Sequence, residues 1–164
     1  CFLVIGDGDL GDGFRRRFGE LRNVMFAGQV PRDEAHRLLA ECDILYFSTF
    51  KSRVWDFGQS LNKLVDYMLA GRPIIGSFSG YPSMVSEAAC GSFIPAGDPG
   101  ALEEEILRYQ SMPREFREEM GARGRTWVIQ NRHYSDLAKT YAAVCGLPNE
   151  EKAADTGCTR SSHD

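Results

Sequence analysis

The sequence lacks the features that mark several large classes of protein. No apolar run approaches the length that spans a membrane, and no signal peptide is visible. The five cysteines include no CxxC pair and no paired spacing, which disfavours both a disulfide framework and a zinc site. We therefore expect reduced cysteines and a cytosolic protein.

The sequence also lacks a strong cluster of basic residues and a cluster of residues with the spacing of metal ligands. The formal net charge is -4, and the tight basic run at residues 15–17 lies in an expected surface helix, so no nucleic-acid partner is expected. The three histidines are scattered and are predicted to be surface residues. The acids Asp7, Asp9 and Asp12 do not have the spacing of a calcium loop. We expect no cofactor and no metal site.

A glycine-rich stretch follows the first apolar segment of the chain. Gly6, Gly8 and Gly11 match the GxGxxG pattern of dinucleotide-binding proteins. The acidic residues among these glycines would repel a pyrophosphate, and Gln29 stands after the next strand, where an acid for the ribose is wanted. NAD binding is therefore disfavoured.

Short apolar segments alternate with helical patterns along most of the chain. Such alternation indicates crossover units and a parallel sheet. The predicted fold is α/β: a Rossmann-like open parallel sheet with helices on both faces and a helical C-terminal segment. The expected strands cover residues 2–5, 24–28, 43–48, 74–75 and 92–95, and the expected helices cover residues 10–21, 32–41, 61–69, 82–89, 101–110, 115–128 and 135–144.

The two ends of the chain differ in their patterns. Residues 146–164 have no periodicity and few large apolar groups, so we expect a disordered tail after a domain of residues 1–145. The chain begins directly on a strand. Because domains seldom start without a lead-in, we expect this to be the C-terminal part of a longer protein.

The stretch from residue 57 to residue 77 carries the strongest functional pattern. A glycine-bearing loop opens a helix that Gly71 ends, and Asn62 and Asp66 lie four residues apart on its polar face. The apolar side chains recur at helical spacing and predict one buried face: Leu61, Leu64, Val65, Met68 and Leu69.

This helix start has the chemistry of an anion site. Free amides and the helix dipole hold anions, and Gly58 would let a ligand approach the backbone closely. A diphosphate at the helix start would leave Asp66, one turn further on, to accept hydrogen bonds from a sugar diol. An ordinary amphipathic surface helix after a glycine turn is the alternative reading of the same residues.

Three segments together resemble a known family. They are FLVIGDGDL (residues 2–10), VMFAGQVPRDEAHRLLAECDILYFS (residues 24–48) and the segment that starts FGQSLNKLVDYMLAGRPIIGS (residues 57–77). In order and spacing they resemble the C-terminal, nucleotide-sugar-binding domain of retaining glycosyltransferases with the GT-B fold, of the bacterial surface-polysaccharide type. The resemblance covers residues 2–144.

The resemblance implies roles for particular residues. In the family, two glutamates flank the loop–helix junction, and Asp66 matches the second, which is expected to bind the donor ribose. The first falls on Gly58, so the side chain expected to hold the transferred sugar is absent there, and Asp56 is the substitute considered. No catalytic residue is assigned. The expected nucleotide and diphosphate contacts are Gln29, Val30, Gly58, Gln59, Ser60, Leu61, Asn62, Lys63 and Asp66, and the expected cleft loop is Gly6, Asp7 and Gly8.

The resemblance also implies an activity, and it implies that parts of the enzyme needed for that activity are missing from this chain. We expect the donor-binding half of a glycosyltransferase that moves a sugar from a UDP- or GDP-sugar to a saccharide or lipid-linked acceptor in cell-surface polysaccharide synthesis. The first strand–helix unit, with an arginine and a lysine for the diphosphate, and the N-terminal acceptor domain would precede Cys1. This chain alone is then expected to bind donor nucleotide weakly and to be inactive.

Three further expectations remain open at this stage. The location is expected to be cytoplasmic, at the inner face of the membrane if the missing part associates peripherally with it. A nucleotide-sugar 2-epimerase of the same fold is an alternative function. A non-catalytic, receiver-like regulatory α/β domain is another, since Asp7 and Asp9 mimic an acidic pair, although no lysine follows Ile94.

Overall fold

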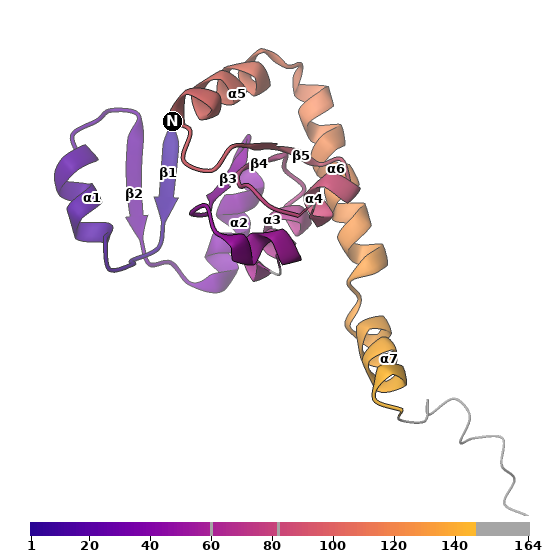
Figure 1. Cartoon of the computed structure of the whole chain (residues 1–164). Helices are drawn as coiled ribbons and strands as arrows, with labels where there is room; N and C mark the ends of the chain where they lie inside the picture. The colour runs from indigo at the N-terminus through magenta and orange to yellow at the C-terminus, as the bar shows by residue number, and fades with distance from the viewer. Residues whose placement is uncertain (60, 82, 147–164) are drawn as a thin grey trace, which may run out of the picture. The chain divides into compact units, whose positions relative to one another are not determined.

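A computed structural model describes residues 1–59, 61–81 and 83–146 of the chain (Figure 1). The chain divides into two compact units, Cys1–Arg125 and Thr126–Asp164. Strands and helices alternate over the first unit, as the sequence predicts. The elements are β1 (Phe2–Ile5), α1 (Gly11–Phe18), β2 (Val24–Gly28), α2 (Arg32–Glu41), β3 (Leu45–Ser48), η1 (Arg53–Phe57), α3 (Asn62–Leu69), β4 (Ile74–Ser77), α4 (Met84–Glu87), β5 (Gly91–Ile94), α5 (Pro99–Ser111), α6 (Arg114–Asn131) and α7 (Tyr134–Val144).

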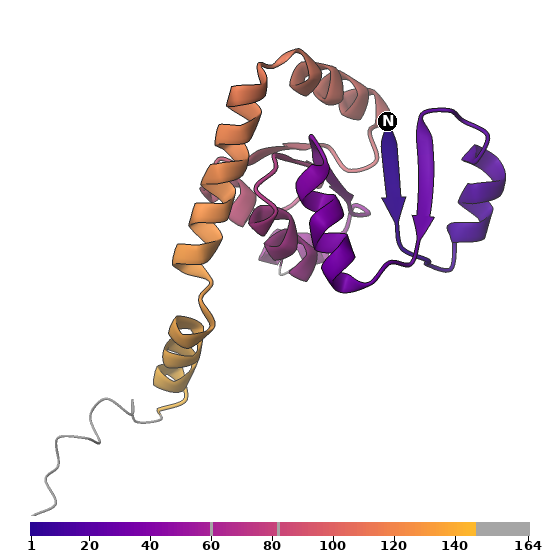
Figure 2. The same ribbon diagram turned by 180° about the vertical axis from the view of Figure 1, so that it is seen from behind.

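All strand pairs in the described residues are parallel, which confirms the predicted fold class. β1 pairs with β2, with Phe2 opposite Val24, and β3, β4 and β5 pair in that order, with Ile74 between Leu45 and Gly91. The strands form two separate sheets rather than the one continuous sheet expected from the sequence. Figure 2 shows the same elements from behind.

The core of the first unit lies on the two faces of the β3–β4–β5 sheet. On one face Ile75 and Ile94 pack with Tyr109 of α5, and all three are buried. Leu64 and Met68 of α3 are fully buried as well. All four residues of β4 are buried. Because successive strand residues point to opposite faces, this sheet is covered on both sides at β4, as an open parallel sheet requires.

β1 is apolar throughout, a pattern typical of a buried strand, yet the structure leaves it partly exposed. Phe2, Leu3 and Val4 are 47%, 37% and 42% exposed, although every residue of the strand is apolar. The strand forms where its sequence predicts, and its β-branched and aromatic residues suit that conformation. Its burial does not follow, because burial depends on which elements pack against it.

Two glycines of α6 also depart from expectation. Gly121 and Gly124 look like weak points in the sequence, yet the helix runs through both without a break. A Cβ at Gly121 would collide with the carbonyl oxygen of Gly71, and one at Gly124 would lie 2.8 Å from Cβ of Cys90. These glycines let α6 approach the loop before β4 and the start of β5 closely.

The second unit confirms the helical C-terminal segment, but three apolar residues at helical spacing in α7 are not buried. Leu137, Tyr141 and Val144 of α7 are 39%, 74% and 83% exposed. An apolar stripe is buried only where another element covers it, and no residue of α7 is buried. The tail expected at residues 146–164 lies outside the described residues from position 147 onwards. Among the described helices, none combines the length and apolarity needed to cross a membrane.

Candidate functional site

α3 starts without a side-chain cap. Its N-cap residue, Leu61, makes no side-chain capping hydrogen bond, and Leu64 N donates to Leu61 O at 2.9 Å. In the described part of the chain, the backbone amides of Asn62 and Lys63 donate to no hydrogen-bond acceptor. The side chains of both residues are exposed. Within the described residues these two amides, at the positive end of the helix dipole, are unpaired, and amides in this position bind anions. Ser60, an expected contact, lies outside the described residues.

The predicted stripe anchors this helix, with one exception. Leu64 and Met68 are buried, whereas Leu69, at the end of the helix, is 41% exposed. Gly71 follows with a φ of 70°, the left-handed C-cap expected from the sequence. Tyr67 donates its hydroxyl to the carbonyl oxygen of Tyr46 at 3.3 Å, and burial raises its pKa, so this phenol stays a neutral donor.

The turn before α3 explains why glycine stands at position 58. The short helix η1 is capped by Ser52, whose Oγ accepts from Val54 N at 3.3 Å, and Trp55 Nε1 donates to Phe50 O at 2.9 Å. Gly58 follows with a φ of 112°, a conformation that side chains strongly disfavour. A carboxylate-bearing residue at this position would strain the turn. Asp56, the considered substitute, is exposed within η1.

Asp66 lies on the second turn of α3 and faces the start of α2. Its Oδ1 is 3.3 Å from Nε2 of His36 and 3.8 Å from Nη2 of Arg32. The Asp66 side chain is 29% exposed, so its carboxylate is within reach of a solvent-borne ligand. The sequence indicates the acid, but it predicts His36 only as a surface residue. Arg32 and His36 are four residues apart and share one face of α2, but nothing in the local sequence relates that face to Asp66.

The loops after β1 and β2 meet each other. Gly6 N donates to Gly28 O at 2.8 Å, and Gly11 N donates to Gly8 O at 2.7 Å in the turn that opens α1. Asp7 and Gly8 are exposed, as a cleft-lining loop requires. Gln29 is exposed and Val30 half-buried.

Arg15 of α1 is a further cation at this edge that sequence reasoning assigned to a solvated helix face. Its Nη2 lies 3.0 Å from the position that a Cβ would take at Gly28. Gly28 has a φ of 70°, so a glycine suits both the backbone and the close approach of the guanidinium. The guanidinium charge of Arg15 therefore lies next to Gly28, the residue that precedes Gln29.

The loop between β3 and α3 contains buried polar atoms. Oγ1 of Thr49 and both amide atoms of the Gln59 side chain are buried, and within the described residues they have no hydrogen-bond partner. Leaving such a group unpaired costs about 1–3 kcal/mol. The Gln59 side chain therefore points inward, and only its backbone could serve as the expected diphosphate donor.

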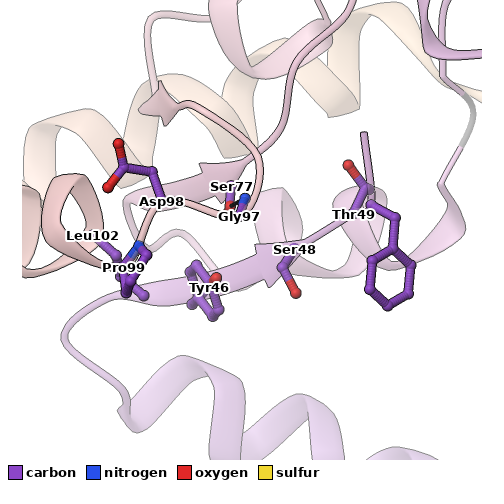
Figure 3. A pocket seen from close by; sticks show the side chains of 9 residues that line it. Tyr46, Ser48, Thr49, Ser77, Gly97, Asp98, Pro99 and Leu102 are labelled. Carbon is purple, nitrogen blue, oxygen red and sulfur yellow. Dashed lines mark hydrogen bonds between the residues drawn. The ribbon is translucent and has the colours of Figure 1, made fainter. Parts of the chain in front are cut away.

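A pocket that the sequence did not predict lies beside this loop. It has a volume of about 320 Å³ and is bounded by the end of β3, β4 and the start of α5 (Figure 3). Asp98 caps α5 by accepting from Ala101 N at 2.9 Å, and Ser77 Oγ accepts from Gly97 N at 3.3 Å. Both polar groups are thus already engaged by the protein. The lining residues are Tyr46, Ser48, Thr49, Phe50, Ser77, Gly97, Asp98, Pro99 and Leu102.

Comparison with known proteins identifies the family to which this chain belongs. Residues 1–111, about two thirds of the chain, match the family model of the glycosyl transferases group 1. The chain therefore belongs to the glycosyl transferases group 1 family. A search of curated protein sequences found no match to the chain.

Solved structures show the same fold at low sequence identity. WaaG, a glycosyltransferase involved in lipopolysaccharide biosynthesis, superposes with a TM-score of 0.63 and 20% identity over 88% of this chain and 38% of its own. Alr3699/HepE of Anabaena, solved in complexes with UDP and with UDP-glucose, superposes with a TM-score of 0.65 and 16% identity over 88% of this chain and 40% of its own. The chain thus has the fold of a GT-B glycosyltransferase domain and spans about two fifths of each neighbour.

Proposed function

We propose that the chain is the C-terminal, donor-binding part of a retaining glycosyltransferase that transfers a hexose from a nucleoside-diphosphate sugar. The observation that carries the proposal is the uncapped start of α3 with Asp66 one turn further on. Family membership and the UDP complexes of a structural neighbour support the substrate class. The acceptor is proposed to be a saccharide or lipid of a cell-surface polysaccharide pathway, with the protein in the cytoplasm.

The amides of Asn62 and Lys63 suit the diphosphate. A departing nucleoside diphosphate gathers negative charge as the bond to the sugar breaks. Donors fixed by a helix need no rearrangement when that charge appears, and one such donor is typically worth about 3 kcal/mol of barrier. The positive charge of Arg15 and Arg32 at the same strand edge adds to the attraction for the donor.

Asp66 suits the ribose. A carboxylate is an acceptor-only group, and its two oxygens can take both hydroxyls of a vicinal diol. His36 and Arg32 hold Oδ1 from the side of α2, which restricts the rotation of the carboxylate before the ligand arrives. Gln29 and Val30 lie after β2, where their backbone groups are proposed to meet the nucleobase.

Calorimetric titration of UDP and GDP into the full-length protein tests this proposal. Asp66→Ala removes a charged hydrogen-bonding partner worth about 1.5–3 kcal/mol, so affinity for the preferred nucleotide should fall about tenfold to a hundredfold. Glu104→Ala is the matched control, because Glu104 is an exposed acid of α5. Equal affinities of the wild type and the Asp66→Ala variant would remove Asp66 from the site.

A further inference from the structure

Asp66 of α3 contacts two side chains of α2, and the two contacts are unequal. Nε2 of His36 lies 3.3 Å from Oδ1 of Asp66, whereas Nη2 of Arg32 lies 3.8 Å from the same oxygen. The Arg32 side chain is 83% exposed, and that of His36 is 46% exposed. An exposed arginine beyond hydrogen-bond distance contributes a charge that solvent and salt screen. His36 is therefore the partner that bears most directly on the orientation of the carboxylate.

The two helices that carry this pair are fixed relative to each other. Arg72, which follows α3, donates from Nε to the carbonyl oxygen of Ala40 in α2 at 2.7 Å. On α3, Leu64 and Met68 have no exposed surface, so the helix cannot roll without opening the close-packed core. The freedom that remains is the rotation of the Asp66 side chain, which is 29% exposed. A side chain that contacts its carboxylate restricts that rotation.

The contact between His36 and Asp66 depends on the charge of the imidazole. Histidine changes its charge between about pH 5 and pH 8, and the charged form donates from both ring nitrogens. The carboxylate of Asp66 is at contact distance, so protonation of the imidazole converts a polar contact into an ion pair. The charged and titratable groups around His36 are Arg32 and Asp33 one turn earlier on α2, and Asp66 on α3 with Lys63 and Tyr67 beside it.

An ion pair on one oxygen leaves the carboxylate able to bind a diol. A carboxylate offers about four acceptor positions on its two oxygens, and both contacts of Asp66 with α2 are made by Oδ1. A carboxylate that is already oriented loses less rotational freedom when a ligand binds. A positive charge on His36, one helical turn from the start of α3, also attracts a diphosphate. Protonation of His36 should therefore strengthen donor binding rather than compete with it.

We propose that His36 is a positioning residue that, in its charged form, fixes the Asp66 carboxylate for the donor ribose, so that affinity for the donor rises as the pH falls from 8 to 6. This role rests on the proposed function, because it requires Asp66 to bind the ribose. His36 itself acts through Asp66 and needs no contact with the ribose. An ion pair that blocked the carboxylate would have the opposite effect and weaken binding as the pH falls.

Calorimetric titration of UDP and GDP into the full-length protein at pH 8 and pH 6 tests the proposal. His36→Gln keeps a polar side chain that stays neutral at both pH values. The affinity of the wild type for the preferred nucleotide should rise about threefold to tenfold more on acidification than that of His36→Gln, as expected for one partly exposed charge. Equal pH dependences of the two proteins, or weaker wild-type binding at pH 6 relative to the variant, would overturn the proposal.

Two controls isolate the contribution of His36. The terminal phosphate of the nucleotide also titrates near pH 6, but its contribution is common to all the protein variants and cancels when their affinities are compared. His133→Gln is the matched substitution, because His133 is an exposed histidine that precedes α7. This variant should keep the pH dependence of the wild type. The same loss of pH dependence in His133→Gln as in His36→Gln would overturn the assignment to His36.

The Asp66→Ala background separates positioning from a merely structural role. In that background His36→Gln should leave the affinity and its pH dependence unchanged, because the carboxylate through which it acts is gone. Discrimination against the 2′-deoxynucleotide at pH 6 should fall about threefold or more in His36→Gln alone. Unchanged affinity in Asp66→Ala would refute the proposed function and this role with it. Weaker binding by Asp66→Ala, with a wild-type pH dependence in His36→Gln, would overturn the role of His36 alone.

Discussion

β1 and β4 are both short, largely apolar parallel strands, yet one is exposed and the other buried. Val4 is 42% exposed in β1, whereas Ile74 and Ile75 of β4 have no exposed surface. β4 lies between β3 and β5, while among the described strands β1 pairs with β2 alone. The comparison shows that local sequence determines whether a strand forms, and that the neighbours determine whether its apolar side chains leave the solvent.

The largest predicted contrast between the two regions is the reactivity of their thiols. Cys1 next to β1 is exposed, whereas Cys90 next to β5 is buried, and burial raises the pKa of Cys90 to about 11. At pH 8 about one Cys90 in a thousand is therefore thiolate, the form that reacts. Iodoacetamide followed by peptide mass spectrometry should label Cys1 more than a hundredfold faster. Comparable rates would show that the β5 region is open.

Truncating one side chain in each strand compares their contributions to stability. Ile75→Ala removes fully buried volume and should lower the free energy of unfolding by about 2–5 kcal/mol. Val4→Ala acts at a partly exposed site and should lower it by less than about 1 kcal/mol. Urea denaturation of the two variants measures both. Equal losses would mean that β1 is already packed in this chain.

Because α6 lies close to the backbone of Gly71, we expect one glycine-to-alanine substitution in this helix to lower the stability of the protein rather than raise it. Replacing a helix-interior glycine by alanine normally stabilises a protein by about 1 kcal/mol. Gly121→Ala should instead destabilise it by about 1–3 kcal/mol, because the new methyl group collides with the backbone of Gly71. Ala122 is exposed on the same helix, and Ala122→Gly provides the control, with a loss of about 1 kcal/mol. Thermal unfolding that shows stabilisation by Gly121→Ala would contradict this packing.

The smallest predicted effect concerns the acid that joins β5 to α5. Hydrogen bonds from Arg108, and secondarily from Ser92, hold the pKa of Glu105 below its ordinary value. A lowered folded-state pKa stabilises the protein above the unfolded-state pKa, and this contribution is lost as the pH falls through the folded-state value. Glu105→Gln should cost about 1 kcal/mol at pH 7 and have a smaller effect at pH 3. A pH-independent cost, measured by urea denaturation, would contradict the role of the charge.

Much of the fold follows from the sequence because its periodicities are local properties. The bounds of β1, β2 and α2 agree with the structure, and Gly71 ends α3 as its position indicates. The burial of Leu64 and Met68 follows from helical spacing. What could not be predicted is the pairing of elements. The exposure of β1, the break between the two sheets and the exposed face of α7 all depend on which elements lie opposite.

The candidate site was predictable only in part for a similar reason. The position of Asp66 could be predicted because the residue lies one helical turn after the start of α3, and helix geometry fixes that distance. Its partners Arg32 and His36 come from another element, and no local pattern relates α2 to α3. The conformation of Gly58 is likewise a property of the turn after η1, and its φ of 112° is one that glycine adopts without strain.

The central claim, that the start of α3 and Asp66 hold the donor nucleotide, is tested most directly by amide chemical shifts. UDP and GDP should be titrated into the ¹⁵N-labelled full-length protein while its backbone resonances are recorded. We predict that the largest shifts occur at Asn62, Lys63 and Asp66, with smaller ones at Gln29. Shifts confined to Tyr46 and Asp98, in the pocket next to α5, would contradict the account.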